Sequence, residues 1–556
     1  MSKKGFTIEY LLYGAVFLLA IGMRFIHLGQ FSLNDYEAVQ ALLALKISSG
    51  SVVQMGDQPA YVILTAGLFR IFAATNFLAR FWPALVGACV VLLPLLFRKI
   101  LGDRWSLLVG LFLAIDPALI AISRTASGES LAIVFGIAAV GFILHKKGIS
   151  AGIFLGAAIA SGPVFWFGLL LLLLVSLISS VLLSPLDLGK LTVKELGVLG
   201  GSAVVTLVLL STGFMTVPNG MTGFANALVS FVNAWSIHSL VSVKTALLVF
   251  TATYLPLLLL GGFGFGVSIG KQRRKAGFLG AWFLLSALLM LINPSGEIID
   301  WVWAALPLWG LTAMGTEAAL QRVGEDERVV LWVQIGLTIT LVIFSFLNVL
   351  AYFFNSSPDL TVNRNRLIGA ALPIGLLLLM TVFLAWGWSP KSAIRGLGLG
   401  IAILLFGWMI SAALKSAGGI IQPSAIGWKP QAITVGETRM TTQLGDLSMW
   451  NHGIRNAIDI DVVGYDVPSM RWALRDFTNV VFDTQFSQVE TPSIIIAPDY
   501  LQIGTSILYR GQGLIWSQYP SYGQMRLYDW VKWTVYRQAP VDQIRLILWA
   551  RNDLFK

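Results

Sequence analysis

Long apolar stretches recur along most of this chain, and they constrain its fold more than any other feature. A helix needs about 20 apolar residues to cross the hydrocarbon core of a membrane. Only 12% of the residues are charged, against about 25% in soluble proteins. The sequence therefore predicts a polytopic membrane protein of about thirteen spans. The predicted spans are 8–28, 78–97, 105–122, 128–144, 149–161, 163–183, 197–214, 245–269, 276–292, 301–319, 329–350, 367–387 and 396–414.

Two short apolar stretches need a separate argument. Gly162-Pro163 follows the first of them, 149–161. Because Gly-Pro breaks helices, 149–183 is predicted to form a tight helical hairpin. The second, 59–73, reaches only ~22 Å as a helix, short of the ~30 Å hydrocarbon core.

The basic residues decide whether 59–73 crosses. If it lies along the surface, 17 basic residues flank the spans inside and 8 flank them outside. If it crosses, the basic segments 98–104 and 271–275 both face outward. The positive-inside rule favours the first arrangement. It leaves two external interfacial helices, at 36–49 and 59–73. The basic excess is thus a topology signal, and no nucleic-acid partner is predicted.

Residues 420–556 differ from the rest of the chain. Short apolar runs such as 457–464 and 492–498 alternate with helix-like stretches such as 467–477. This pattern is typical of a small α/β domain with its own core. The overall prediction is an all-α polytopic membrane protein with a small C-terminal extracytoplasmic α/β domain.

Two carboxylates, Asp35 and Glu37, follow the external end of the first span. Carboxylates at a membrane surface are costly unless solvated or paired, so they are functional candidates. In one interpretation Asn34 and Glu37 form a capping box at the start of a helix. In the other, one carboxylate is a general base and its partner shapes a polar site. Side chains two residues apart on a regular helix diverge by about 200°. A shared pocket therefore requires a junction between loop and helix.

Arg124 is the only cation in the outer turn between 105–122 and 128–144. A guanidinium suits forked recognition of phosphate oxygens. Snorkelling to lipid headgroups is the structural alternative. Glu129, in the same turn, is either the partner of Arg124 or a second acid of the site. Asp116, which precedes Pro117, indicates a helix kink.

The sequence offers few metal ligands beyond carboxylates. The four histidines lack metal-ligand spacing, and Cys89 is the single cysteine. His238, in the external loop 215–244, is a candidate for lining the site. If a divalent metal such as Mg²⁺ or Mn²⁺ takes part, Asp35 and Glu37 are its candidate ligands.

The order of these features resembles the GT-C superfamily of membrane glycosyltransferases. It is similar to the protein O-mannosyltransferases, the aminoarabinose transferases and a flippase-activity-associated family. The acidic motif is followed by Q-P-A-Y at 58–61, A-R-F-W-P-A-L-V-G at 79–87 and P-x-x-x-x-x-S-R at 117–124. In the tail, M-R-W-A-L-R-D at 470–476 resembles a W-Y-L-R-D motif of the flippase-associated family.

The resemblance covers about residues 8–215 in detail and the rest by architecture. It implies a catalytic transmembrane module at 1–214, a variable transmembrane module at 215–419 and the extracytoplasmic domain at 420–556. It also implies an enzyme of the plasma membrane. Such an enzyme transfers a sugar, with inversion, from a polyprenyl-phosphate donor to a protein, lipid or glycan acceptor on the extracytoplasmic face.

The resemblance also assigns roles to residues. By position, Asp35 takes the proton of the acceptor and Arg124 holds the lipid phosphate. Further donor-site candidates are Arg80, Glu129 and His238. The adjacent Asp-Glu pair of the family is Asp35-Tyr36-Glu37 here, which leaves Glu37 as an alternative base.

Two other functions stay open: a non-catalytic accessory protein of envelope glycan assembly, and a flippase or transporter of lipid-linked sugars. A transporter needs charged residues at midplane depth or broken helices in both halves. The polar candidates instead cluster on one external face, which is an argument against transport.

Overall fold

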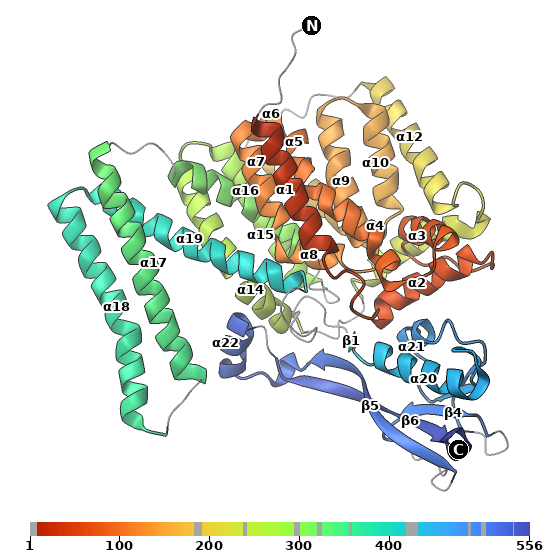
Figure 1. Cartoon of the computed structure of the whole chain (residues 1–556). Coiled ribbons are helices and arrows are strands. Elements are labelled where there is room, and N and C mark those ends of the chain that lie inside the picture. The colour runs from red at the N-terminus through yellow and green to blue at the C-terminus, as the bar shows by residue number, and fades with distance from the viewer. Residues whose placement is uncertain are drawn as a thin grey trace.

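The structure is a computed structural model that describes residues 8–182, 192–236, 242–293, 301–319, 325–354, 358–418, 432–486, 491–501, 508–536 and 539–555. It consists of a bundle of long helices and a C-terminal sheet domain at one end of the bundle (Figure 1). The helices α17 (Glu325–Phe354) and α18 (Leu360–Gly387) form a hairpin at the side of the bundle, joined to it by α19 (Pro390–Ser416).

A helix stands at each place where the sequence predicts a span. Among the described residues, eight helices are long and apolar enough to cross a membrane, or nine with one bent pair. The count of thirteen stays a prediction. The helices are α1 (Ile8–Phe25), α4 (Asn76–Ala88) continued by η1 (Cys89–Leu92) and α5 (Leu93–Leu96), α7 (Asp103–Ala114) with α8 (Pro117–Ser123), α9 (Glu129–Leu144), α10 (Gly148–Ile159), α11 (Pro163–Leu182), α12 (Val193–Ser211), α14 (Val243–Ile269), α15 (Arg273–Ile292), α16 (Val302–Ala319), α17 (Glu325–Phe354), α18 (Leu360–Gly387) and α19 (Pro390–Ser416).

The predicted kink at Asp116 is confirmed. The axes of α7 and α8 differ by 59°. Asp116 is the N-cap of α8, since its Oδ1 accepts a hydrogen bond from Leu119 N at 2.8 Å. Pro117 occupies the first helical position, where a missing N–H costs nothing. Asp116 also accepts hydrogen bonds from Tyr254 and Trp309, so the kink is fixed by its neighbours.

The predicted hairpin of α10 and α11 is only partly correct. Its helix break is present, because Gly162 adopts φ +127° between the two helices. However, α10 packs mainly against α9 and α12. A Cβ at Gly152 would lie 1.9 Å from Ser202 Oγ. The glycine therefore lets α10 approach α12 more closely than a larger residue would allow.

The two predicted interfacial helices are present as α2 (Asp35–Ser48) and α3 (Pro59–Ile71). Both lie at the end of the bundle that faces the C-terminal domain (Figure 1). Asp35 and the carbonyl of Ala74 each contact that domain. Residues 35–74 thus begin and end at the same end of the molecule. This supports the prediction that 59–73 does not cross the membrane. A further helix, α13 (Met221–Asn233), lies in the loop after α12 and has no counterpart among the predicted helices.

The C-terminal region is an α/β domain, as predicted. Its six-stranded sheet has the order β1-β5-β6-β4-β2-β3, with β2 parallel to β3 and β4, and the other pairs antiparallel. Side chains of the strands and of the helices α20 and α21 fill its core. The elements are β1 (Ile433–Thr434), α20 (Glu437–His452), β2 (Ile460–Val463), α21 (Pro468–Ala473), β3 (Val480–Asp483), β4 (Ile494–Pro498), β5 (Tyr509–Pro520), α22 (Leu527–Tyr536) and β6 (Val541–Arg551).

The basic segment 98–104 and the C-terminal domain lie at opposite ends of the helical bundle. At the end opposite the C-terminal domain, Arg98 forms an ion pair with Glu9 at the start of α1. The basic segment 98–104 and the start of α1 therefore share one end, in agreement with the topology that the flanking charges predict.

Cysteine labelling in a Cys89→Ala background tests the orientation. Val52 and Thr75 are exposed on either side of α3, and Lys147 is exposed in the turn between α9 and α10. We expect Cys at 52 and at 75 to react with an impermeant reagent added from outside, and Cys at 147 to react only after the membrane is opened. Reaction of position 75 from the cytoplasm alone would contradict the arrangement.

Candidate functional site

Glu37 is held in a buried ion pair with Arg80. Its side chain is 1% exposed and that of Arg80 is 5% exposed. Arg80 Nε donates to Glu37 Oε1 at 2.8 Å, and Arg80 Nη2 donates to Oε2 at 2.7 Å. This fork is the geometry in which a guanidinium binds a carboxylate most strongly. The pair links the first turn of α2 to α4.

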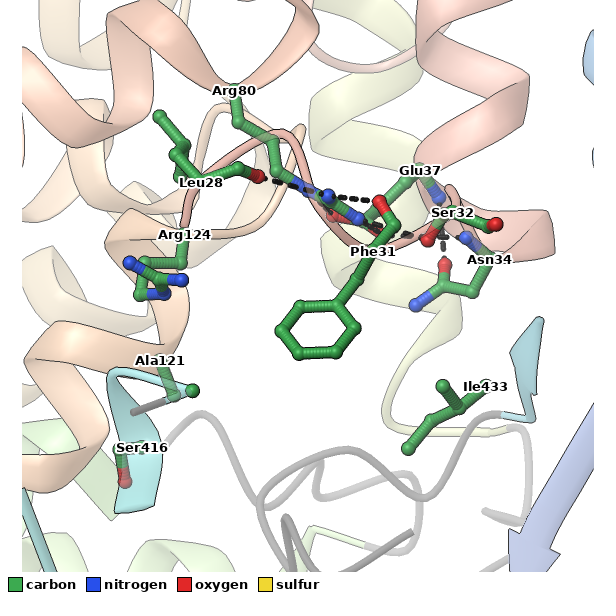
Figure 2. A pocket seen from close by; sticks show the side chains of 11 residues that line it. Leu28, Phe31, Ser32, Asn34, Glu37, Arg80, Ala121, Arg124, Ser416 and Ile433 are labelled. Carbon is green, nitrogen blue, oxygen red and sulfur yellow. Dashed lines mark hydrogen bonds and ion pairs between the residues drawn. The ribbon is translucent and has the colours of Figure 1, made fainter. Parts of the chain in front are cut away.

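The other donors of Arg80 are also engaged. Its two terminal nitrogens donate to the carbonyls of Leu28, Phe31 and Ser32, at 3.2, 2.6 and 3.1 Å. A guanidinium has five N–H groups, and all five are used. The segment between α1 and α2 therefore wraps around the guanidinium of Arg80, which binds three of its carbonyl groups (Figure 2).

The capping box at the start of α2 is present. Asn34 Oδ1 accepts from Glu37 N at 2.9 Å, and Glu37 Oε2 accepts from Asn34 N at 3.2 Å. Glu37 Oε1 also accepts from Ala126 N at 3.0 Å, in the turn before α9. The carboxylate thus receives hydrogen bonds from three parts of the chain, which is the structural role that the sequence left open.

Asp35 faces a different part of the molecule. Its Oδ1 accepts a hydrogen bond from Ser469 N, in the first turn of α21, at 3.0 Å. The side chain is half-buried. It is not among the residues that line the cavity beside Glu37. Both carboxylates belong to the regular helix α2, and their contacts diverge as the helical spacing requires.

Arg124 lines a small cavity of about 60 Å³ that is partly open to solvent. The residue is 8% exposed. Its Nη1 donates to the carbonyls of Arg24 and Ile26 at 2.9 and 2.8 Å. Figure 2 shows its guanidinium on the wall of this cavity, above Ser416 and with Phe31 beside it. Glu37 and Arg80 line the same cavity.

The charge of Arg124 is not balanced by an ion pair within the described residues. Burial, and to a lesser extent the nearby Arg80, lower the pKa of Arg124 to about 10. The side chain is still protonated at neutral pH. A buried cation beside a cavity is suited to an anionic group of a ligand. Its low exposure does not match that of a side chain that snorkels to headgroups.

Glu129 belongs to a second polar group and does not pair with Arg124. It accepts a hydrogen bond from the hydroxyl of Tyr36 at 2.9 Å, and Tyr36 in turn accepts one from Gln58 at 2.8 Å. Gln58 Oε1 accepts from Gly128 N at 2.7 Å. Tyr36, which the sequence marks only as the residue that separates the two acids, therefore connects α2 to the start of α9.

Two further expectations concern His238 and a divalent metal. His238 lies outside the described residues, so its place in the site stays a prediction. Asp35 and Glu37 do not fit a shared divalent metal in this structure, because one contacts Ser469 and the other is forked to Arg80. Among the described residues no three His, Cys, Asp or Glu side chains gather as metal ligands.

Arg24, which is not among the residues singled out from the sequence, is fully buried in α1. Its side chain donates to Ser123 Oγ and to the carbonyls of Ala20, Leu113 and Ala114. Its own carbonyl accepts from Arg124. Arg24 thus fixes α1 against the bent pair that carries Arg124. A lone cation inside an apolar span was the available signal.

Together, the helical bundle, the two short helices after α1 and the C-terminal α/β domain define a polytopic membrane protein. The chain is similar to two crystal structures of ArnT from Cupriavidus metallidurans. One, bound to undecaprenyl phosphate, has 15% identity and a TM-score of 0.55 over 97% of each chain. The other, in the apo state, has 14% identity and a TM-score of 0.53 over 97% of each chain.

ArnT is an aminoarabinose transferase of the GT-C superfamily, so the predicted resemblance is confirmed at the level of the fold. The Saccharomyces cerevisiae protein O-mannosyltransferase complex Pmt1-Pmt2 matches 41% of this chain at 18% identity, with a TM-score of 0.30 that supports no argument. No family model and no curated protein sequence matches the chain.

Proposed function

We propose that this protein is a membrane glycosyltransferase that moves a sugar from a polyprenyl-phosphate donor to an acceptor on the extracytoplasmic face. The observation that carries the proposal is Arg124, a buried cation on the wall of a cavity, in a chain with the fold of ArnT over 97% of its length. One of the two ArnT crystal structures contains bound undecaprenyl phosphate, which is a polyprenyl phosphate of the kind that such a transfer releases.

In this proposal Arg124 binds the phosphate of the donor lipid, which becomes the leaving group. Its Nη1 is anchored on the carbonyls of Arg24 and Ile26. Among the described residues, this anchor leaves the rest of the guanidinium available to phosphate oxygens. Charge that develops on the leaving phosphate is stabilised by a donor that is already in place, which is the usual way an enzyme lowers such a barrier.

Asp35 is the proposed general base for an inverting transfer. The carboxylate of Glu37 already accepts four hydrogen bonds, two of them from Arg80. Asp35 Oδ1 accepts one, from Ser469 N. The less engaged carboxylate is the better candidate for taking the proton of an acceptor hydroxyl. Glu37 and Arg80 then act as positioning residues, which fix the first turn of α2.

Arg124→Ala tests the phosphate site. The loss of a charge-assisted contact to phosphate costs about 1.5–3 kcal/mol, which is roughly a 10- to 150-fold decrease in kcat/KM for the donor. Arg124→Lys keeps the charge but loses the fork, so it should recover only part of the activity. Arg70, which is exposed on α3, is the matched control. If Arg124→Ala behaves like Arg70→Ala, Arg124 does not bind the donor.

A second candidate function is supported by the engagement of Glu37. A carboxylate fully committed to Arg80 and to backbone N–H groups fits a non-catalytic member of the fold, acting as an accessory protein in envelope glycan assembly. One measurement, the release of polyprenyl phosphate, distinguishes the two functions. The enzyme releases polyprenyl phosphate from a polyprenyl-phosphate sugar, and the accessory protein does not.

A further inference from the structure

Three aromatic side chains of the C-terminal domain, Trp472, Tyr522 and Trp533, are buried in clusters of the helical bundle, outside the core of their own domain. Trp472, in the M-R-W-A-L-R-D motif, is 0% exposed. It belongs to the hydrophobic cluster of α2, α3 and the start of α4, which includes Ala41, Tyr61 and Phe69. Its neighbours in the motif, Met470, Ala473 and Leu474, belong instead to the core of the C-terminal domain. The helix α21 thus contributes side chains to both bodies.

Polar contacts fix the position of Trp472. Its Nε1 donates to Asn76 Oδ1, at the start of α4, at 2.7 Å. The guanidinium of Arg475 lies 4.2 Å from the centroid of the Trp472 ring. Arg475 also donates to the carbonyl of Ala74 at 3.1 Å. A tryptophan that buries its ring and satisfies its N–H is an effective anchor between two surfaces.

The same helix contacts the candidate base. Ser469 N donates to Asp35 Oδ1 at 3.0 Å. The first turn of α2 is therefore held from two sides. Glu37 is fixed by Arg80 in the helical bundle, and Asp35 is fixed by α21 in the C-terminal domain.

We propose that α21 docks the C-terminal domain onto α2, α3 and α4, and that this contact positions the first turn of α2 and Asp35. Trp472 is then a positioning residue for the transfer reaction. The catalytic part rests on the proposed function, whereas the docking does not. A misplacement of about 1 Å can reduce a rate by about 10²-fold, so the loss of the anchor should affect turnover although Trp472 does not touch the reacting atoms.

The test compares Trp472→Ala with Trp450→Ala in the full-length protein in lipid nanodiscs. Trp450 is 80% exposed on α20 of the same domain and is a matched control. Hydrogen exchange measured by mass spectrometry reports the docking, and a transfer assay reports kcat and the KM for the donor. For Trp472→Ala we expect faster exchange in α21 and in the first turn of α2, unchanged exchange in β4 and β6, and a kcat about 10- to 100-fold lower with little change in KM.

A double-mutant cycle avoids variants that fail to fold. Trp472→Phe and Asn76→Ala remove the two partners of one hydrogen bond while the bulk of the ring remains. If the bond acts as proposed, the double variant should lose no more activity than either single variant. Additive losses would show that the two residues act independently and would overturn the anchor.

The outcomes separate the two parts of the proposal. Wild-type exchange in α2 and α21 of Trp472→Ala would overturn the docking. Faster exchange with a wild-type kcat would overturn the positioning of Asp35. If the wild-type protein transfers no sugar at all, the proposed function fails, while the exchange of the first turn of α2 still decides whether α21 positions it.

Discussion

Asp35→Asn is expected to lower sugar turnover by about 10²–10⁴-fold with little loss of stability. An amide cannot accept a proton from the acceptor hydroxyl. The amide oxygen can still accept the hydrogen bond that Ser469 N donates to Asp35 Oδ1 at 3.0 Å. The substitution therefore removes the base and keeps the contact with α21. Turnover and the thermal unfolding midpoint of the purified protein provide the two readouts.

Two further variants, Asp35→Ala and Glu37→Gln, separate the role of base from the contact with α21 and from the role of Glu37. Asp35→Ala also removes the acceptor for Ser469 N, so it should loosen α21 in addition to abolishing turnover. Glu37→Gln keeps an acceptor for the capping hydrogen bond and should affect turnover less than Asp35→Asn. Full activity of Asp35→Asn with an inactive Glu37→Gln would transfer the role of base to Glu37.

Arg80→Ala is expected to destabilise the protein by about 3–5 kcal/mol, because it leaves a buried carboxylate without its partner. Glu37 is 1% exposed in this pair. The free energy of unfolding, measured with a denaturant in detergent micelles, checks the prediction. The control is Arg98→Ala, which breaks ion pairs with Glu9 and Asp103 that are partly exposed. Exposed pairs contribute about 0–1 kcal/mol.

An equal effect of the two substitutions would contradict the structural role of the pair of Arg80 and Glu37. The double variant Arg80→Leu with Glu37→Leu provides a second check. Replacing both partners of a buried pair with apolar residues avoids the isolated charge and is often close to neutral for stability. We therefore expect it to be more stable than Arg80→Ala.

The sequence predicts most of the helical architecture, because the length of an apolar stretch and the sign of its flanking charges are local properties. The two short helices are expected at 36–49 and 59–73 and are found at Asp35–Ser48 and Pro59–Ile71. Packing partners are not local. The divergence of α10 from α11 depends on the close contact between Gly152 and Ser202, and a sequence alone does not place those two residues together.

The sequence predicts which residues belong to the candidate site, but it does not predict which of them contact one another. The structure brings Glu37, Arg80 and Arg124 to one cavity. The pairing of Glu37 with Arg80 joins residues 43 positions apart, and the capping pattern gives no sign of it. Asp35 and Glu37 lie on one regular helix, in which side chains two residues apart diverge. Glu37 therefore lines the cavity, whereas Asp35 contacts α21. The tail motif is recognisable in the sequence, but the burial of Trp472 among α2, α3 and α4 depends on the docked domain.

The proposed function requires that this protein uses a polyprenyl-phosphate sugar. It is tested most directly by the release of polyprenyl phosphate from a panel of labelled polyprenyl-phosphate sugars, with the full-length protein in membranes that supply the natural acceptor. We expect release by the wild-type protein, a decrease of about 10²–10⁴-fold in Asp35→Asn and one of roughly 10- to 150-fold in Arg124→Ala. No release by the wild-type protein from any donor in the panel would contradict the proposed transferase function and favour the accessory function.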